Sequence, residues 1–178
     1  MSISLRYCPA CGEKHFQTGD SKPWHCPDCG LDFFQNTAAA AGALVCDEQN
    51  RLLMVQRAKD PSKGKWGLPG GFIDAGESVE QALLRECREE IGIEIESPIF
   101  LCSFPNRYAY KGIVYATIDL YFRVQTRQAN AVRALDEVAQ IGWFDPAHID
   151  PETVAFPSCV RAIECLNAVL GNQADAES

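Results

Sequence analysis

Three glutamates in one short segment, residues 78–91, have the spacing to bind a metal ion together. In a helix, at about 100° per residue, Val79 and the apolar side chains that follow it share one inward face. Glu86 and Glu90 fall in the middle of that face, and Glu89 lies beside them. Unpaired carboxylates are costly to bury, so these acids must meet a cation. Because hard oxygen ligands suit Mg²⁺ or Mn²⁺, the pattern predicts a divalent metal site.

The alternative is a solvated, glutamate-rich helix face, which is the commoner arrangement in proteins. It is disfavoured here because the acids continue the apolar stripe. Arg85 and Arg88 are the nearest cations in the segment, but they fall at about 120° and about 180° from Val79. We therefore expect metal, rather than arginine, to balance these charges.

A second possible metal site consists of two CxxC pairs near the N-terminus, Cys8 with Cys11 and Cys26 with Cys29. A glycine follows each pair and suits a tight turn that aims two sulfurs at one point. Four thiolates close a tetrahedral site, so the spacing predicts a structural zinc ion. The alternatives are a redox CxxC or two disulfides, but redox motifs occur singly and no export signal precedes the pairs.

Composition narrows the class of partner and compartment. The net charge of −8 argues against a nucleic-acid-binding surface. Neither a signal peptide nor an apolar run of membrane-spanning length is apparent. We therefore expect a cytoplasmic protein with no nucleic-acid or membrane partner. The cysteines outside the CxxC pairs are expected to be small buried hydrophobes: Cys46, Cys87, Cys102, Cys159 and Cys165.

These residues need elements that position them. A capping-box pattern, Ser78 with Gln81, starts the acid-bearing helix, and Gly92 suits its end. Further periodicity and turn signals predict strands over 37–46, 51–57, 94–104, 113–125 and 140–144, with a final helix over 157–170. The chain thus divides into a zinc ribbon (1–36), an α/β domain (37–170) and a flexible tail (171–178).

The acid-bearing segment resembles the Nudix box, GX5EX7REUXEEXGU. Gly71, Glu77 and the run Arg85-Glu-Cys-Arg-Glu-Glu-Ile-Gly-Ile93 meet every fixed position, with Cys87 where a bulky aliphatic residue is usual. The upstream Gly-Leu-Pro-Gly-Gly71 and the downstream Asp-Glu137 also look like this family. The resemblance implies an α/β/α sandwich around a mixed sheet. It further implies hydrolysis of a nucleoside diphosphate linked to another moiety.

The resemblance also assigns roles to individual residues. Glu86 and Glu90 would be the principal ligands of Mg²⁺ or Mn²⁺, assisted by Glu89 and by the carbonyl of Gly70. Arg85 and Glu77 would brace the loop against the helix. Glu137 matches a position where many members keep a further acid that binds metal or acts as a base.

The substrate is less sharply indicated. A zinc ribbon before a Nudix domain resembles the NADH pyrophosphatase branch, but that branch's Ser-Gln-Pro-Trp array is replaced here by Ser-Pro-Ile-Phe100 and Ser-Phe-Pro-Asn106. ADP-ribose, NADH and FAD all stay open. Candidate phosphate contacts are Arg57, Lys65, Arg107 and Lys111, and Tyr108 or Tyr110 could stack on a base. For each of them the alternative is a solvated loop residue or a strand aromatic.

A function of another class is a nucleotide-sensing module whose ribbon contacts nucleic acid or a partner protein. The intact acids of the box disfavour this alternative, since a retired enzyme is free to lose them. Residues 1–36 hold three Lys or Arg against four Asp or Glu, which does not suit nucleic-acid contact. A small-molecule nucleoside diphosphate derivative is the expected ligand, and a homodimer is a possible assembly.

Overall fold

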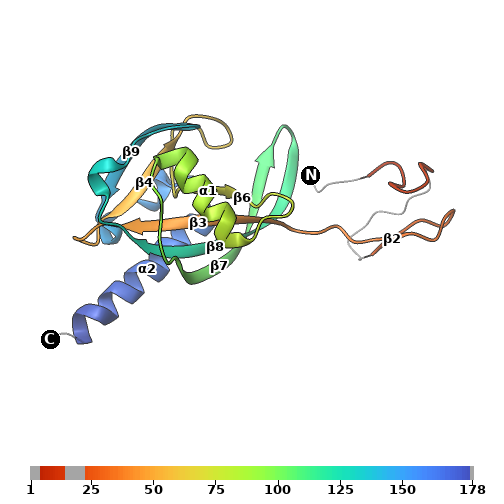
Figure 1. Cartoon of the computed structure of the whole chain (residues 1–178). Coiled ribbons are helices and arrows are strands. Elements are labelled where there is room, and N and C mark those ends of the chain that lie inside the picture. Colours follow the sequence, from red (N-terminus) through yellow and green to blue (C-terminus); the bar gives the residue numbers. More distant parts are fainter. Residues whose placement is uncertain (1–4, 15–22, 177–178) are drawn as a thin grey trace.

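The structure is a computed structural model that describes residues 5–14 and 23–176. Residues 1–4 and 15–22 of the expected ribbon, and 177–178 of the expected tail, lie outside the described residues. The chain carries a small N-terminal ribbon joined by an extended segment to a larger α/β domain (Figure 1). Within the described residues, no helix has the length and apolar character needed to cross a membrane.

The ribbon holds one short antiparallel pair, β1 (Trp24–His25) with β2 (Asp32–Phe33). The ring of Trp24 stacks on Phe33 at 6.1 Å, and a small cluster of buried side chains forms around Cys8, Trp24 and Cys26. This is little apolar surface for an independent fold. The ribbon therefore needs a further source of stability, such as metal binding by its cysteines.

The larger domain is built on a mixed seven-stranded sheet. Its strands are β3 (Ala38–Cys46), β4 (Leu52–Arg57), β5 (Trp66–Gly67), β6 (Gly70–Phe72), β7 (Ile99–Tyr110), β8 (Ile113–Gln125) and β9 (Val138–Phe144). The main path runs β5-β4-β3-β8-β7, while β6 pairs with β3 and β9 pairs with β4. Among the strand pairs of the described residues, β3–β8 alone is parallel, and it places Ala41 opposite Leu120.

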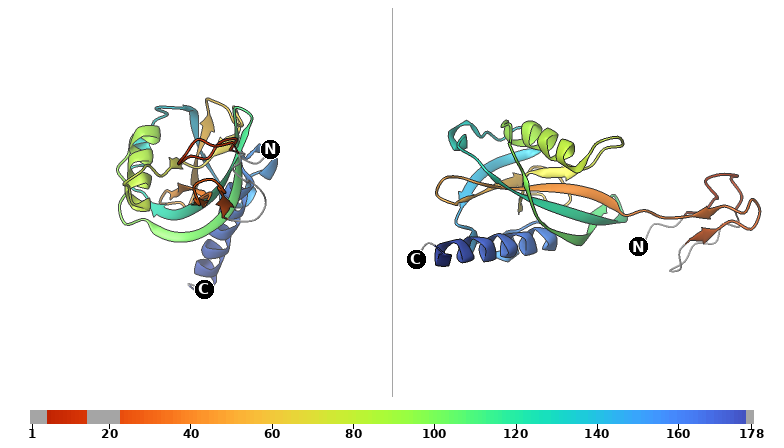
Figure 2. Two further views of the ribbon diagram at one scale, coloured as in Figure 1. Left: turned by 90° about the vertical axis from the view of Figure 1, so that its right-hand side faces the viewer. Right: turned by 60° about the horizontal axis from the view of Figure 1, so that its bottom comes forward.

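Helices cover both faces of this sheet, α1 (Val79–Ile91) on one and α2 (Pro157–Ala176) on the other (Figure 2). Strand β3 shows why. Ala41, Ala43 and Val45 enter the core beneath α1, whereas Leu44 and Cys46 enter the core beneath α2. A strand buried on both faces appears as a continuous apolar run in sequence. The predicted α/β/α sandwich is therefore confirmed.

Helix α1 begins and ends where the sequence predicts. The hydroxyl of Ser78 accepts from the backbone N–H of Gln81, whose side chain accepts from the N–H of Ser78. Gly92 ends the helix at φ 72°, a left-handed conformation that costs glycine little. Leu83, Cys87 and Ile91 bury the predicted apolar face.

Helix α2 is longer than the predicted 157–170 and continues to Ala176. Gly171 does not end it, and residues 171–173 are exposed. Three 3-10 turns connect the other elements: Ala129–Ala131, Pro146–His148 and Pro151–Thr153. Of the scattered cysteines, Cys46, Cys87 and Cys159 are buried as expected, while Cys102 and Cys165 are only half-buried.

The predicted strand over 94–104 is misplaced, because β7 starts at Ile99 and runs to Tyr110. Ile93 and Ile95 are buried in the core beneath α1 without forming a strand, which explains the misleading apolar pattern. Strand β7 lies at the sheet edge, where Pro105 is tolerated. It joins β8 through Lys111 and Gly112, both at positive φ, as a two-residue hairpin requires.

Candidate active site

A cavity of about 400 Å³ lies between the sheet and the acid-bearing face of α1. One end is lined by Gly70, Gly71, Glu86, Glu89 and Glu90, which the sequence predicts to be functional. The other end lies across β3 from β6 and is lined by residues of β7 and β8, together with Phe156 and Cys159. Glu137, Arg85, Arg57 and Tyr108 also line the cavity.

Glu90 is the most enclosed of the three acids of the box on α1, Glu86, Glu89 and Glu90. Its Oε2 accepts from the backbone N–H of Gly70 at 2.9 Å. Burial raises the pKa of Glu90 to about 8, against the lowering effect of the Gly70 hydrogen bond, and the nearby charge of Glu86 raises it further. Because burial makes the charged form of Glu90 costly, a cation beside this carboxylate would stabilise it.

Glu86 lies directly against the glycine turn. A Cβ added to Gly71 would clash with the Glu86 carboxylate, and one added to Gly70, at φ 142°, would clash with the carbonyl of Ala41. Gly71 therefore lets β6 pass close to Glu86, and Gly70 lets β6 pass close to β3. The side chain of Glu86 is 15% exposed, and burial raises its pKa.

The expectation that Arg85 points away from the acids is wrong. Its Nη1 donates to Glu86 Oε1 at 2.7 Å and to Glu89 Oε2 at 3.2 Å. Helical geometry gives the position of Arg85 around the helix axis correctly. Its long side chain, however, curves around the helix to reach the acids. Arg88 does point elsewhere and forms an ion pair with Glu94.

Arg85 also joins the helix to the preceding loop. Its Nε and Nη2 donate to the two carboxylate oxygens of Glu77 at 2.9 and 3.0 Å. Nη2 additionally donates to the carbonyl of Phe72 at 3.1 Å. Glu77 does not line the cavity, so its contact with the site passes through Arg85.

The contacts of the box acids show whether they suit a divalent ion. In the described part of the chain, the three acids of α1 do not place their oxygens within 4.8 Å of one another. Glu90 instead accepts a hydrogen bond from the backbone of Gly70, whereas Glu86 and Glu89 share the guanidinium of Arg85. The donor set still fits a hard cation, because two enclosed carboxylates with raised pKa share one cavity wall.

Glu137 approaches from the loop before β9. It is a non-glycine residue at φ 48°, and its carboxylate pairs with Lys59 at 2.9 Å. Both side chains are more than half exposed, so this pair can open at little cost. Glu137 lines the same cavity as Glu90, and its charge helps to raise the pKa of Glu90.

The predicted substrate-binding residues separate into two groups. Arg57 lines the cavity with its guanidinium over the ring of Phe156 at 5.2 Å. Tyr108 lines it too, at 5.9 Å from Phe156. The remaining candidates, Lys65, Arg107 and Tyr110, do not line the cavity and are exposed.

Sequence reasoning missed a buried polar network at the far end of the cavity. Asp119 on β8 accepts hydrogen bonds from Thr117, Asn106 and Ser158. Asp119 is 8% exposed, and Ser158 is 1% exposed. The available signal was a single carboxylate within the apolar run of β8, in a strand buried on both faces.

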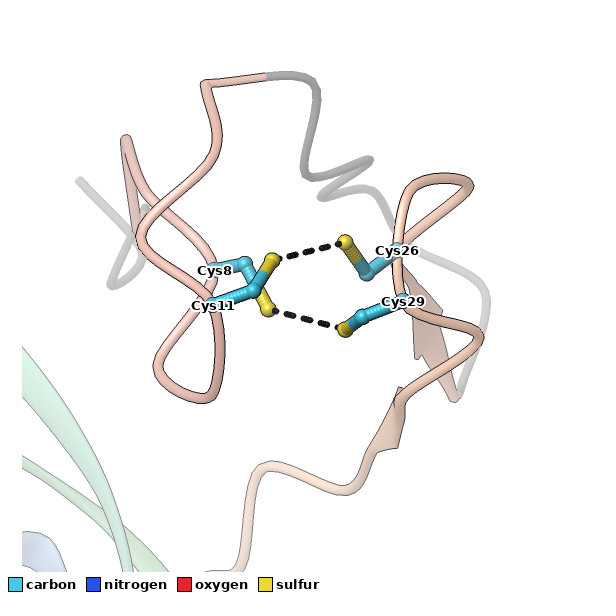
Figure 3. A group of neighbouring side chains, drawn as sticks. All are labelled: Cys8, Cys11, Cys26 and Cys29. Carbon is cyan, nitrogen blue, oxygen red and sulfur yellow. Dashed lines mark hydrogen bonds between the residues drawn. The ribbon is translucent and has the colours of Figure 1, made fainter.

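The four cysteines of the ribbon form the second site, and their side chains converge (Figure 3). Cys8 Sγ lies 3.7 Å from Cys29 Sγ, and Cys11 Sγ lies 3.7 Å from Cys26 Sγ. A tetrahedron with ~2.3 Å metal–sulfur bonds has edges of about 3.8 Å, so the spacing fits a metal ion. It is far too long for disulfides, and all four cysteines are free.

Two matching turns build this arrangement. The N–H of Gly12 donates to the Cys8 carbonyl, and the N–H of Gly30 donates to the Cys26 carbonyl, each at 2.9 Å. Both glycines have positive φ, 78° and 75°. The predicted role of glycine in each CxxC turn is confirmed.

Comparisons with known proteins agree with this architecture. The family model described as "NUDIX domain" matches residues 36–159. The NAD-capped RNA hydrolase NudC of Stutzerimonas stutzeri is 27% identical over 149 residues, 82% of this chain and 49% of that protein. The mouse 8-oxo-dGDP phosphatase NUDT18 is 36% identical over 156 residues, 86% of this chain and 44% of that protein. The chain thus spans about half the length of these relatives.

A solved structure supports the fold. The NUDIX hydrolase from Nitrosomonas europaea superposes with a TM-score of 0.69 at 22% identity, over 90% of this chain and 89% of that one. At that identity the likeness concerns the fold alone. Together with the family-model match over most of the chain, it leads to one conclusion: this chain belongs to the NUDIX domain family.

Proposed function

We propose that this chain is a divalent-metal-dependent hydrolase. It cleaves the pyrophosphate bond of a nucleoside diphosphate linked to another moiety, of the ADP-ribose or dinucleotide type. The observation that carries the proposal is a single cavity with the box acids at one end and aromatic and hydrogen-bonding groups at the other. Such a cavity suits an elongated substrate whose diphosphate lies against the acids.

Glu86 and Glu90 would hold Mg²⁺ or Mn²⁺, with Glu89 and the carbonyl of Gly70 completing the ligand set. The bound ion would neutralise the diphosphate and lower the pKa of the attacking water. Arg85 would keep Glu86 and Glu89 in place, because its guanidinium already contacts both. Glu77 would hold Arg85 in that position.

The reaction also needs a proton acceptor. Water attacks a phosphorus atom, the bridging P–O bond breaks, and the water proton passes to a base. Glu137 is the proposed base, since its exposed ion pair with Lys59 can open toward the cavity. Arg57 would contact a phosphate, and the ring of Tyr108 would stack on the substrate's base.

The ribbon would hold one zinc ion through its four cysteines in a structural role. A site closed by four thiolates has no open position for a substrate or water. The ion would instead provide the stability that the small apolar cluster of the ribbon lacks.

A panel of diphosphates tests the proposal. ADP-ribose, NADH, FAD and a short NAD-capped RNA would be incubated with the protein and Mg²⁺ or Mn²⁺, and products separated by chromatography. We expect the protein to hydrolyse at least one of the small molecules, and Glu86→Gln to lose that activity. Because the net charge is −8, we expect the RNA to be cleaved more slowly. Tight binding of a nucleotide without any turnover would favour the sensing module instead.

A further inference from the structure

The cavity has a second polar end, which the proposed metal site does not use. Asp119 lies there, on β8, together with Asn106 on β7. We infer that these two side chains select the base end of the ligand. They bind an N–H donor that stands beside a hydrogen-bond acceptor on an aromatic ring. The inference rests on the proposed function for placing a diphosphate at the opposite end.

The carboxylate of Asp119 can accept one more hydrogen bond than the described residues donate to it. Its Oδ1 accepts from Thr117 at 2.9 Å, and its Oδ2 accepts from Asn106 at 2.8 Å and from Ser158 at 2.6 Å. A carboxylate offers about four acceptor positions, so one stays open on the Oδ1 side among the described contacts. That oxygen belongs to a side chain that lines the cavity.

The hydrogen-bonding partners of this carboxylate are neutral. They are a threonine, an asparagine and a serine, and no ion pair involves Asp119 in the described part of the chain. A nearly buried carboxylate without a cation gains from each further donor that reaches it. A ligand N–H therefore meets a strong acceptor at this position.

Asn106 supplies the complementary donor. One N–H of its amide donates to Asp119, and its Oδ1 accepts from the backbone N–H of Arg107 at 2.8 Å. These two contacts fix the orientation of the amide and leave its second N–H for a ligand. An acceptor next to a donor matches the amino group and ring nitrogen of adenine, or the carboxamide of nicotinamide.

An aromatic wall stands beside this pair. Tyr108 and Phe156 both line the cavity, with ring centroids 5.9 Å apart and an interplanar angle of 36°. Phe72 meets Tyr108 edge-on at 5.2 Å and holds its ring in place. A flat heteroaromatic ring can pack on this wall while its edge reaches the two polar groups.

The carboxylate is held rigidly from behind. The hydroxyl of Tyr121 donates to Ser158, which in turn donates to Asp119. Ser158 is 1% exposed and does not line the cavity. A fixed acceptor of this kind rejects a ligand that presents an oxygen acceptor at the same place, since neither group could then be satisfied.

Paired nucleotides that differ in one group test the inference. Dissociation constants of AMP and IMP would be measured by calorimetry with Mg²⁺ present, alongside kcat/KM for ADP-ribose and its hypoxanthine counterpart. The wild type should favour the amino compounds by about 10-fold to 100-fold, the usual value of a buried hydrogen bond to a charged group. Asp119→Asn should reduce this preference to about threefold or less.

A second pair identifies which ring occupies the site. Nicotinamide mononucleotide and nicotinic acid mononucleotide differ only in carboxamide against carboxylate. A preference that depends on Asp119 in the adenine pair or in the nicotinamide pair supports the inference and names the ring. Equal affinities within both pairs, or preferences that Asp119→Asn leaves intact, would overturn it.

Two further variants separate selection from stability. Ser158→Ala removes one donor behind the carboxylate, so it should lower the Tm. It should keep most of the preference, because Thr117 and Asn106 still hold Asp119. Asn106→Leu removes the cavity-facing amide from a half-buried site and should weaken the preference even if Asp119→Asn fails to fold. If Ser158→Ala abolishes the preference as fully as Asp119→Asn, the assignment to the open acceptor is wrong. Because binding is measured without turnover, a protein that discriminates but does not hydrolyse would contradict only the proposed function.

Discussion

Removing the buried charge of Glu90 should stabilise the metal-free protein at alkaline pH. Burial raises the pKa of Glu90 to about 8, because desolvation outweighs the hydrogen bond from Gly70. In the unfolded chain a glutamate titrates near 4.3. Glu90→Gln keeps the shape of the side chain and an oxygen that accepts from Gly70, but carries no charge at any pH.

The pH range follows from these two values. Below about pH 4 the carboxyl is protonated in both the folded and the unfolded state. The neutral carboxyl of Glu90 then makes its full contribution to the free energy of unfolding. Between about pH 4 and 8 the unfolded chain releases its proton first, so this contribution declines, and it is lost as pH rises through the folded pKa. A difference of about 3.5 units corresponds to about 5 kcal/mol as an upper limit, at 1.36 kcal/mol per unit.

The expected gain is smaller, because Glu90 lines an open cavity and lies near the charge of Arg57. We expect Glu90→Gln to raise the free energy of unfolding by roughly 2–4 kcal/mol at pH 9 and by less than about 1 kcal/mol at pH 5. For a domain of this size that is about 4–16 °C in Tm at pH 9.

Thermal unfolding at pH 5, 7 and 9 measures this gain, after dialysis into buffer without divalent ions or chelator, so that thiolate-bound metal is retained. Glu89→Gln is the matched control, since its carboxylate lies on the same helix and is 50% exposed. It should change the Tm by no more than about 2 °C at any pH. A gain for Glu90→Gln that is absent at pH 9, or equal at all three pH values, would refute the reasoning.

Two further predictions concern the ribbon and the glycine turn. Metal analysis of protein purified without chelator should find one zinc per chain, and Cys26→Ser should lose most of it while keeping measurable Mg²⁺-dependent activity; a zinc-free wild type, or complete inactivation of a soluble variant, would contradict this. Gly71→Ala should lower kcat at least about tenfold, because its Cβ would displace the Glu86 carboxylate, and leave zinc content unchanged. Wild-type kcat in this variant would show that the close approach of loop and acid is dispensable.

Sequence alone predicted those features that depend on neighbours along the chain. The capping box at Ser78 and the left-handed Gly92 are local, and both ends of α1 were correctly placed. The CxxC turns are local in the same sense, with Gly12 and Gly30 closing each turn. Strands β3 and β8 were found because a strand buried on both faces leaves a long apolar run.

The features that sequence missed depend on long side chains or on distant partners. Helical geometry placed the backbone of Arg85 correctly but could not show that its guanidinium reaches Glu86 and Glu89. Asp119 reads as an isolated polar residue until the fold brings Ser158 to it from 39 positions away. Strand β7 starts at Ile99, later than predicted, because Ile93 and Ile95 are buried in the core without belonging to a strand.

The central claim is that Glu86 and Glu90 bind the divalent ion that hydrolysis requires. Free Mn²⁺ can be titrated by electron paramagnetic resonance in the wild type, Glu86→Gln, Glu90→Gln and Glu89→Gln, with turnover of the best diphosphate measured on the same samples. We predict that Glu86→Gln and Glu90→Gln each lose Mn²⁺ affinity and turnover together, and that Glu89→Gln is affected less. Wild-type Mn²⁺ binding and turnover in Glu86→Gln and Glu90→Gln would contradict the claim.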